Sequence, residues 1–333
     1  MNIGVGYAAH VPAPTVIEAA RTAERLGFCT FWVTDSHLIG REVFTLLGAL
    51  AISTERIALG TGVSHLAGRH PSIHASALAT LDELAPGRIR LGIGVGDSGS
   101  NNLGVPRASL AELEQAVTGI RALLNGEETP GPGETPLKLS FAPTRNPVPI
   151  YVAGAGERLH RLSGRVADGA LLSTSPGELT RAIESVRAGE REAGRLAGQT
   201  RILLWTTVSV DDDAAKARAA VRGAVARRAV NALSRGAKQG ALDPEDQRAF
   251  ERLQRAYASH PHGTTGAHEL AELVPEPWID RFAIAGTPET VRERLERAFA
   301  DGADEVAMIL LGSNPQDRGS PDLLERFAER VMR

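Results

Sequence analysis

The chain contains a single cysteine, Cys29, so an internal disulfide is excluded. Neither sign of charge is in excess, because 37 Lys and Arg stand against 40 Asp and Glu, and this balance argues against a nucleic-acid-binding surface. No apolar run approaches the roughly 20 residues that span a bilayer. The N-terminal residues also lack the basic start and apolar run of a secretory signal. We therefore expect a cytoplasmic protein without membrane or nucleic-acid partners.

Aromatic residues make up only 4% of the chain, whereas 35 glycines and 19 prolines are spread along its length. The glycines and prolines separate short apolar runs from longer amphipathic segments, and this alternation is typical of an α/β protein. The apolar runs predict strands at residues 3–7, 30–34, 57–61, 89–95, 149–153, 169–173, 202–208 and 305–311. The intervening segments predict helices at residues 15–26, 43–53, 71–85, 108–124, 157–166, 178–193, 213–233 and 321–333.

Runs such as IRLGIGV and RILLWTTV are apolar nearly throughout, as expected for parallel strands that are covered on both faces. Eight successive βα units favour a closed (β/α)8 TIM barrel. A doubly wound open sheet with a second domain is the alternative, because periodicity does not show whether a sheet closes. We expect one domain over residues 1–333, with an insertion at about residues 234–287 on the face at the carboxyl ends of the strands.

Polar residues follow the second predicted strand, where Asp35 and His37 lie two positions apart. In a barrel, the carboxyl ends of the strands form the functional face, so this pair could place a carboxylate and an imidazole in one pocket. The alternative is a turn in which Asp35 accepts backbone hydrogen bonds and His37 is solvated. The sequence alone leaves these two interpretations open.

Asp97 follows the fourth predicted strand, after the glycine-rich run GIGVG. Glycines allow a flat ligand to approach the backbone closely, and a carboxylate beside such a ligand would suit redox chemistry. The alternative is an Asx turn that closes the loop. The run is a weak match to a dinucleotide-binding fingerprint, because the final glycine that opens a helix is missing.

The fifth predicted strand ends in Ala153, Gly154, Ala155 and Gly156 and leads directly into a helix. Free backbone N–H groups and the positive end of the helix dipole meet at such a turn, so it could bind a phosphate or another anion. Small residues at a turn between strand and helix also serve close packing, and both interpretations stay open at this point.

We expect no metal site and no hydrolase triad. His70 and His74 lie one helical turn apart, but no Glu or Cys nearby completes a zinc site, and His70 is placed to cap the helix that starts at Pro71. Ser64 and Ser98 lie outside any nucleophile elbow of the G-x-S-x-G type.

Several segments together resemble the bacterial luciferase-like oxidoreductase superfamily, and the resemblance covers nearly the whole chain. They are WVTDSHL, LGTGVSHLAGRHP, ASALATLDELAPGRIRLGIGVGDS and VPIYVAGAGERLHRLSGRVADGALL. The sequence is most similar to the deazaflavin-dependent branch, whose members include methylenetetrahydromethanopterin reductase. The resemblance implies a (β/α)8 barrel that binds coenzyme F420, or alternatively FMN, in its mouth and transfers hydride to or from the ring carbon C5. It also implies a small-molecule substrate with a C=N, C=C or C=O bond and is compatible with a homodimer.

The resemblance also implies roles for individual residues. It places a non-prolyl cis peptide bond between Gly62 and Val63, and it gives catalytic roles to Asp97, Asp35 and His37. Residues expected to contact the cofactor are Thr34, Asp35, Gly62, Val63, Ser64, Gly94, Asp97, Ala153, Gly154, Ala155 and Gly156.

Two departures from the family pattern bear on function. Relatives commonly read Asp-His after strand two, whereas Ser36 intervenes here. The methanopterin reductases carry a Glu near the end of strand one, and this chain has Gly6 at that position, which disfavours the same pterin reaction. The neighbouring Tyr7 and His10 are alternative proton donors.

Three alternatives to a coenzyme F420-dependent oxidoreductase stay open on sequence alone. The first is an FMN-dependent monooxygenase that receives reduced flavin from a partner reductase. The second is a flavin-free, NADH-dependent methylenetetrahydrofolate reductase, and the third is a non-catalytic flavin-binding protein. The same fold serves all of them, so the choice rests on similarity to the branch rather than on physical argument.

Overall fold

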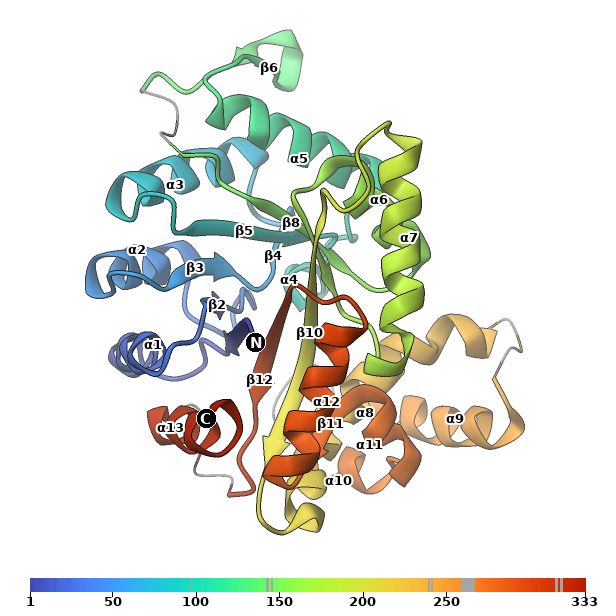
Figure 1. Ribbon diagram of the computed structural model, residues 1–333. Coiled ribbons are helices and arrows are strands. Elements are labelled where there is room, and N and C mark those ends of the chain that lie inside the picture. The colour runs from blue at the N-terminus through green and yellow to red at the C-terminus, as the bar shows by residue number, and fades with distance from the viewer. Residues whose placement is uncertain are drawn as a thin grey trace.

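The computed structural model describes residues 1–96, 98–141, 144, 146–238, 240, 242–258, 267–314, 317 and 320–333. Within these ranges, eight parallel strands close into a barrel that is surrounded by helices (Figure 1). In their order around the barrel, the strands are β1 Ile3–Tyr7, β2 Thr30–Val33, β3 Ala58–Thr61, β5 Ile89–Gly94, β8 Ile150–Gly154, β9 Gly169–Leu172, β10 Arg201–Val210 and β12 Glu305–Leu310. The pairing of β9 with β10 and of β12 with β1 closes the ring. The predicted barrel is therefore confirmed, and the open-sheet alternative is wrong.

All eight predicted strands are present, with ends that differ by at most two residues from the predicted ones. Four shorter strands lie outside this ring. The strand β4 Ser64–His65 pairs with β5, and β11 Ala283–Gly286 pairs with β10. The strands β6 Thr129–Pro130 and β7 Pro136–Leu137 form an antiparallel hairpin. The sequence analysis does not predict these four. Three of them have only two residues, which is too short for a recognisable periodicity, and β11 lies in the segment predicted as an insertion.

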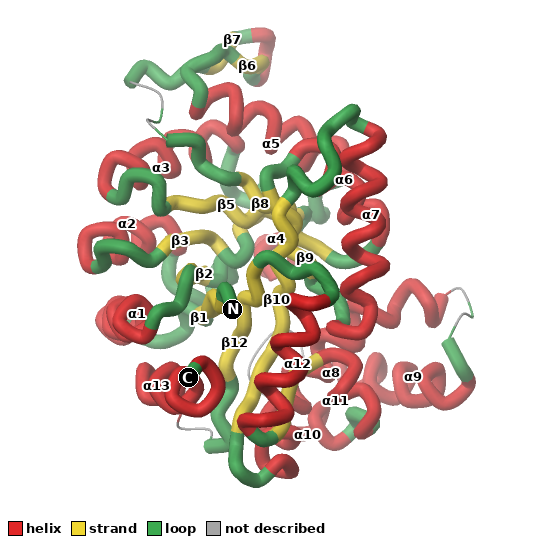
Figure 2. The backbone as a smooth tube through the Cα atoms, in the orientation of Figure 1, coloured by secondary structure: helices red, strands yellow, loops and turns green. Residues whose placement is uncertain are grey.

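The helices that cover the barrel are α1 Ala13–Leu26, α2 Val43–Ser53, α3 Pro71–Leu84, α5 Leu110–Leu124, α6 Glu157–Val166, α7 Leu179–Glu192, α12 Pro288–Ala300 and α13 Pro321–Phe327 (Figure 2). Their ends carry the expected caps. Ser109 and Glu112 form a capping box at the start of α5, and Gly27 ends α1 with a left-handed φ of 87°. In the described part of the chain, no helix has the combination of length and apolar character that crossing a membrane requires.

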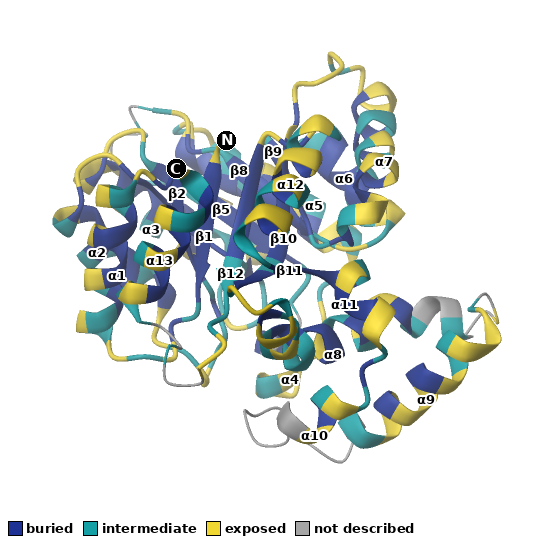
Figure 3. Ribbon diagram, turned by 60° about the horizontal axis from the view of Figure 1, so that its bottom comes forward, coloured by how far each residue is buried: buried dark blue, intermediate teal, exposed yellow. Residues whose placement is uncertain are grey.

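The helix that follows strand seven differs from the prediction. The predicted helix at residues 213–233 exists as α8 Ala214–Lys238, but α8 packs with α9 Pro244–Ala258, α10 Ala267–Glu272 and α11 Glu276–Phe282 around an apolar cluster of their own. The barrel wall beside β10 and β12 is instead formed by α12, which the sequence analysis does not predict. Val291, Leu295 and Ala298 of α12 are buried in the main core. Figure 3 shows α8–α11 gathered on one side of the barrel.

The barrel lumen is filled by a few large side chains that pack against glycines. Trp32 and Tyr151 are almost fully buried in the lumen, and their rings meet edge to face with centroids 5.4 Å apart. A Cβ atom at Gly60 would lie 2.6 Å from the Trp32 ring, and one at Gly169 would lie 2.2 Å from the Tyr151 ring. These glycines are therefore required so that bulky rings from other strands fit inside the barrel.

An ion pair closes the end of the lumen at the amino ends of the strands. Arg90 of β5 lies 3.0 Å from the Glu305 carboxylate of β12, and Nε1 of Trp32 donates to the same carboxylate at 2.8 Å. The Glu305 side chain is only 4% exposed, so both of its oxygens are satisfied inside the protein. This end of the barrel is therefore sealed, and a ligand can enter only from the carboxyl ends of the strands.

Candidate active site

The loops that follow strands two to five meet at the open end of the barrel. Ser64, after β3, donates a hydrogen bond to Asp35, after β2, and the short strand β4 pairs Ser64 with Ile93 and His65 with Gly94 of β5. Strand β8, which ends at Gly154, pairs with β5 on its other side. The structure thus brings the described residues of these four loops, which exclude Asp97, to one rim.

Asp35 is the most strongly held of the predicted site residues. Its side chain is 3% exposed, and Oδ2 accepts hydrogen bonds from Ser64 Oγ at 2.8 Å and from Arg69 Nη1 at 2.5 Å. Arg69 also pairs with Glu42 at 2.8 Å and lies over the Phe44 ring. Burial alone would lower the pKa of Arg69, but the two carboxylates raise it overall. The Asp35 carboxylate is therefore neutralised by a guanidinium that the sequence analysis does not identify.

Behind Asp35 and Ser64, the His74 side chain lies deeper in the protein. Its Nε2 lies 3.1 Å from Ser64 Oγ, and its Nδ1 lies 3.3 Å from the carbonyl oxygen of His70. Because Ser64 donates its proton to Asp35, both the Ser64 oxygen and the His70 carbonyl oxygen face the His74 ring as acceptors, and the single N–H of a neutral ring donates to one of them. Burial lowers the pKa of His74 from 6.5 to about 4, so the ring is neutral at neutral pH. His70 caps α3 as predicted, since its ring accepts from the backbone N–H of Ser72.

His37 is partly exposed at the same rim and does not hydrogen-bond to Asp35. Its carbonyl oxygen accepts a hydrogen bond of 2.6 Å from Asn102 of the short helix α4 Ser98–Leu103. Asp35 therefore joins the Arg69 group, and no hydrogen bond links it to the His37 ring, so a shared role of the two residues stays a prediction.

The peptide bond between Gly62 and Val63 is cis, as the family resemblance implies. Gly62 follows the last residue of β3, and its N–H donates to the carbonyl oxygen of Val33 at 2.7 Å. Val63 lies against the apolar residues of the lumen. The segment from Gly62 to Ser64 therefore turns at the top of the lumen, next to the Asp35 carboxylate.

His65 is a buried imidazole that is not among the predicted site residues. It is 3% exposed, and neither ring nitrogen has a hydrogen-bond partner among the described residues. A Cβ atom at Gly99 of α4 would lie 2.1 Å from Nε2, so the helix backbone rests directly on the ring. Burial lowers the pKa of His65 and favours the neutral imidazole.

Asp97, the predicted acid beside the cofactor ring, lies outside the described residues. The residues around it are consistent with a tight turn at the rim. Gly96 has a left-handed φ of 85°, and a Cβ atom there would lie 2.5 Å from Ser100 Oγ. The role of Asp97 stays a prediction.

The loop after β8 has the geometry of an anion site. Gly156 forms the N-cap of α6 with φ of 93°, and no side chain caps the helix. The N–H of Leu159 donates to the carbonyl oxygen of Gly156 at 3.1 Å, whereas those of Glu157 and Arg158 have no acceptor among the described residues and are available to a ligand. Ala155 is exposed to solvent, and a Cβ atom at Gly154 would lie 2.4 Å from Leu159. The sequence prediction of small residues leading directly into a helix is confirmed, whereas anion binding is untested.

The end of strand one offers no acid. A Cβ atom at Gly6 would lie 2.6 Å from the Trp205 ring, so the indole occupies the space that a side chain at this position would need. Tyr7 points to the opposite face of β1, where its ring packs on Phe31 with centroids 5.2 Å apart, and burial raises its pKa. Tyr7 therefore belongs to the layer between strands and helices, and the interpretation of Tyr7 as a proton donor is wrong.

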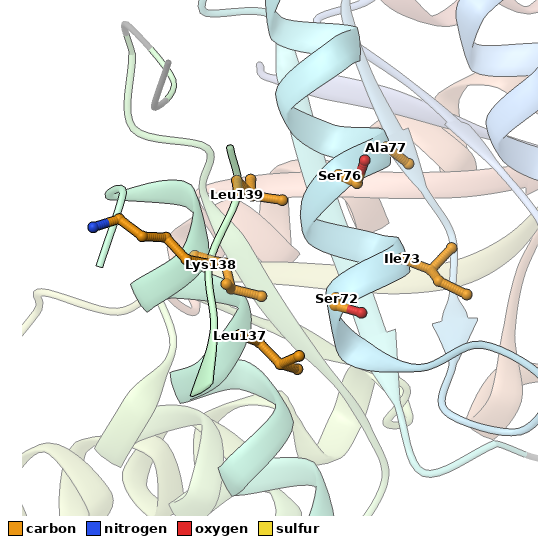
Figure 4. Close-up of a pocket in the computed structure, with 8 residues that line it drawn as sticks. Ser72, Ile73, Ser76, Ala77, Leu137, Lys138 and Leu139 are labelled. Carbon is orange, nitrogen blue, oxygen red and sulfur yellow. The ribbon is translucent and has the colours of Figure 1, made fainter. Parts of the chain in front are cut away.

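A separate groove lies on the outside of the barrel, between α3 and the segment that follows β7 (Figure 4). Its lining is mostly apolar or uncharged, with Lys138 at its edge, and consists of Ser72, Ile73, Ser76, Ala77, Leu123, Leu137, Lys138 and Leu139. It contains none of the predicted site residues and no acid or imidazole, so it lacks groups for redox or proton-transfer chemistry.

Comparison with known proteins agrees with this architecture. The chain is 31% identical to the 5,10-methylenetetrahydromethanopterin reductase of Archaeoglobus fulgidus, over 92% of both proteins. It is 33% identical to the F420-dependent glucose-6-phosphate dehydrogenase of Beutenbergia cavernae, over 93% of this chain and 90% of the relative. The solved coenzyme F420 dependent tetrahydromethanopterin reductase of Methanopyrus kandleri superposes with a TM-score of 0.82 at 24% identity, covering 99% of this chain and 98% of that chain. Residues 2–305 match the family model of the luciferase-like monooxygenases, and the chain belongs to this family.

Proposed function

We propose that this protein is a coenzyme F420-dependent oxidoreductase that transfers hydride between the deazaflavin and a C=N, C=C or C=O bond of a small molecule. The observation that carries the proposal is identity of about one third, over more than nine tenths of the chain, to enzymes named as a methylenetetrahydromethanopterin reductase and an F420-dependent dehydrogenase. The site supports it, because a sealed lumen opens at one end onto a rim with a helix N-terminus that no side chain caps, buried imidazoles and a carboxylate paired with a guanidinium.

The residues at the rim fit a flat ring with a phosphate-bearing tail. The free N–H groups of Ala155, Gly156 and the first turn of α6 would hold the phosphate. Gly62 and Gly94 allow the chain to pack closely at the rim beside Thr34, Asp35 and Ser64, since a Cβ atom there would meet Trp205 or the Ala153 carbonyl oxygen. When bound, the deazaflavin supplies the hydride or accepts it at C5.

The protein would contribute orientation, charge and the exclusion of water. The Asp35 carboxylate is fixed by Ser64 and Arg69 within 2.8 Å, so it can accept a hydrogen bond from a ligand without moving. The partly exposed His37 ring and the predicted acid Asp97 are the groups proposed to donate or accept the proton that accompanies hydride transfer.

The helices α8–α11 are proposed to cover the substrate, which makes the whole chain a single functional domain. Arg228 of α8 donates to the carbonyl oxygens of Thr174, after β9, and Trp205 of β10. Arg281 of α11 lies 3.6 Å from Glu178, which follows β9. These contacts attach the helices to the mouth of the barrel, where they would shield a hydride from water.

The role of Asp97 is tested by Asp97→Asn. This variant should keep cofactor affinity and lower turnover by roughly tenfold or more, which is the low end of what a positioned proton-transfer group contributes. Binding by fluorescence titration and turnover by the change in deazaflavin absorbance are measured on the same preparation. Unchanged turnover would remove Asp97 from the mechanism.

The phosphate site is tested at Ala155 rather than at Gly156, because the φ of 93° at Gly156 would strain any other residue there. Ala155→Asp adds a negative charge beside the free N–H groups and should weaken F420 by roughly tenfold or more. Its affinity for the dephosphorylated riboside should change little, and Ala155→Asn is the neutral control. Equal weakening of both ligands would contradict a phosphate at this loop.

We also propose that the protein acts in the cytoplasm as a homodimer through α2 and α3. Helix α2 contains no charged residue, although Ile52 on its outer side is 74% exposed. On the neighbouring α3, Ile73 and Leu84 are 52% and 47% exposed. Exposed apolar side chains of this size on two neighbouring helices are typical of a protein interface.

An FMN-dependent monooxygenase is the second candidate, because the family model that matches residues 2–305 is described by that activity. The same rim would hold either ring, so the two candidates differ in cofactor preference rather than in fold. A direct comparison of the affinities for F420 and for FMN decides between them.

A further inference from the structure

Trp205 crosses the lumen at the level of the barrel mouth. It belongs to β10, and β3 lies four strands away on the opposite side of the ring. A Cβ atom at Gly6 of β1 would lie 2.6 Å from Cη2 of Trp205, and a Cβ atom at Gly62, which follows β3, would lie 2.6 Å from the same atom. The indole therefore reaches from one wall to the other, and two glycines are needed to admit it.

The indole marks the depth to which a ligand can enter. The lumen around it is filled by side chains that are at most 6% exposed: Trp32, Tyr151, Ala153, Leu171, Leu203 and Ala307. Trp205 and Val63 pack on this cluster but are themselves only partly buried. The Trp205 side chain therefore packs on the filled lumen while part of it stays accessible.

The hydrogen bonding of Trp205 differs from that of the other two tryptophans. Nε1 of Trp32 donates to Glu305 at 2.8 Å, and Nε1 of Trp278 donates to Asp246 at 2.6 Å. No described residue accepts a hydrogen bond from Nε1 of Trp205. Because a largely buried indole N–H normally finds an acceptor, this donor is available to a ligand in the mouth.

The backbone of Trp205 is held in place from outside the barrel. Its carbonyl oxygen accepts a hydrogen bond of 3.1 Å from Nη2 of Arg228, where β10 extends beyond β9. Its two neighbours in the strand, Leu204 and Thr206, are fully buried on the other face of the sheet. The ring is therefore fixed before any ligand binds, as a preorganised contact requires.

We propose that the Trp205 indole is the floor of the cofactor chamber, in direct contact with the bound deazaflavin ring, and that its Nε1–H donates to an acceptor on that ring. This inference rests on the proposed function. It adds a ligand-contacting residue from strand β10, which no motif at the strand ends indicates. A tricyclic ring with carbonyl and nitrogen acceptors suits both the flat surface and the free donor.

The experiment compares Trp205→Phe and Trp205→Ala by titration with F420 and with its dephosphorylated riboside. Trp205→Phe keeps a ring but removes the donor, and it should weaken both ligands by roughly threefold to tenfold. Trp205→Ala also removes the contact surface and should weaken both by roughly tenfold or more. The two ligands should be weakened equally, because Trp205 is proposed to contact the ring and not the phosphate. Ala155→Asp, by contrast, should weaken F420 and leave the riboside nearly unchanged. Trp278→Phe, which lies in the separate cluster of α8–α11, is the matched control and should bind both as wild type does.

Fluorescence lifetime distinguishes direct contact between Trp205 and the bound ring from a purely structural role of Trp205 in the lumen. An indole in van der Waals contact with an excited flavin-type ring shortens the fluorescence lifetime of that ring. The lifetime of the bound riboside should therefore lengthen in Trp205→Phe and stay unchanged in Trp278→Phe. Thermal unfolding of each variant shows whether the chain is folded, and Trp205→Phe, which keeps the lumen filled, gives the decisive result if Trp205→Ala does not fold.

The outcomes distinguish this inference from the function on which it rests. Wild-type affinity and lifetime in Trp205→Phe would contradict the contact while leaving an F420-dependent enzyme intact. A wild-type chain that binds neither F420 nor the riboside would contradict the proposed function and the inference together.

Discussion

Acidification should destabilise this protein through His74, a residue that lies next to the candidate site but does not line it. The His74 side chain is fully buried, its Nε2 lies 3.1 Å from Ser64 Oγ, and its ring meets that of Phe44 edge to face. Burial lowers the pKa of His74 from 6.5 to about 4. The folded chain therefore resists protonation of this ring, whereas the unfolded chain does not.

The size and sign of the effect follow from this difference. Between about pH 6.5 and pH 4, the unfolded chain binds more protons at His74 than the folded chain, so the free energy of unfolding falls as the pH falls through this window. The full difference between the pKa values of His74 in the unfolded and the folded chain corresponds to about 3 kcal/mol of unfolding free energy. About 2 kcal/mol of this should be lost on going from neutral pH to about pH 5, and none of it above about pH 7.5.

The assay is urea unfolding of the wild type and of His74→Gln at about pH 7.5 and at about pH 5. Glutamine keeps a donor towards Ser64 but does not titrate, and the carboxylates that titrate in this range are common to both proteins. The wild type should lose about 2 kcal/mol more than the variant on acidification, whatever the stability of the variant at neutral pH. Equal losses in the two proteins would refute the reasoning, because they would show that protonation of His74 is not coupled to folding.

Three further substitutions test the packing of the barrel and its outer face. Arg90→Met leaves the Glu305 carboxylate buried without its cation and should lower the free energy of unfolding by about 3 to 5 kcal/mol, measured in denaturant. Gly169→Ala places a Cβ atom 2.2 Å from the Tyr151 ring and should cost about 1 to 3 kcal/mol in the same measurement, and a wild-type midpoint would show that the lumen has room. Ile52→Glu should convert the proposed dimer to a monomer in sedimentation velocity without loss of helical content, and a wild type that is already monomeric would contradict the dimer.

The strands of the barrel could be predicted closely because each is covered on both faces and therefore reads as an uninterrupted apolar run. The run IRLGIGV is an example, since the structure has β5 at Ile89–Gly94. The helix α12 was missed although its signals are present: Thr287 caps it, Pro288 opens it, and its buried residues recur at helical spacing. The long predicted helix before it satisfied the expected βα alternation, so the sequence pattern gave no reason to look for a second one.

Parts of the candidate site that are formed by one continuous stretch of sequence could be predicted. Contacts between residues that are far apart in the sequence could not. The glycine-rich turn at residues 154–156 is read from one stretch of sequence, and the structure shows the expected N-terminus of a helix there. The partner of Asp35 is Arg69, which comes from a different loop, so nothing near Asp35 indicates it. Trp205 reads as an ordinary apolar strand residue, and only the closed barrel places its ring beside Gly6 and Gly62.

The central claim is that this barrel uses a deazaflavin, and the most direct test is a paired titration of the purified protein with F420 and with FMN at one ionic strength. The account predicts that F420 binds at least about tenfold more tightly than FMN, and that Ala155→Asp removes most of this affinity. Tighter binding of FMN than of F420 would contradict the account and would favour the monooxygenase.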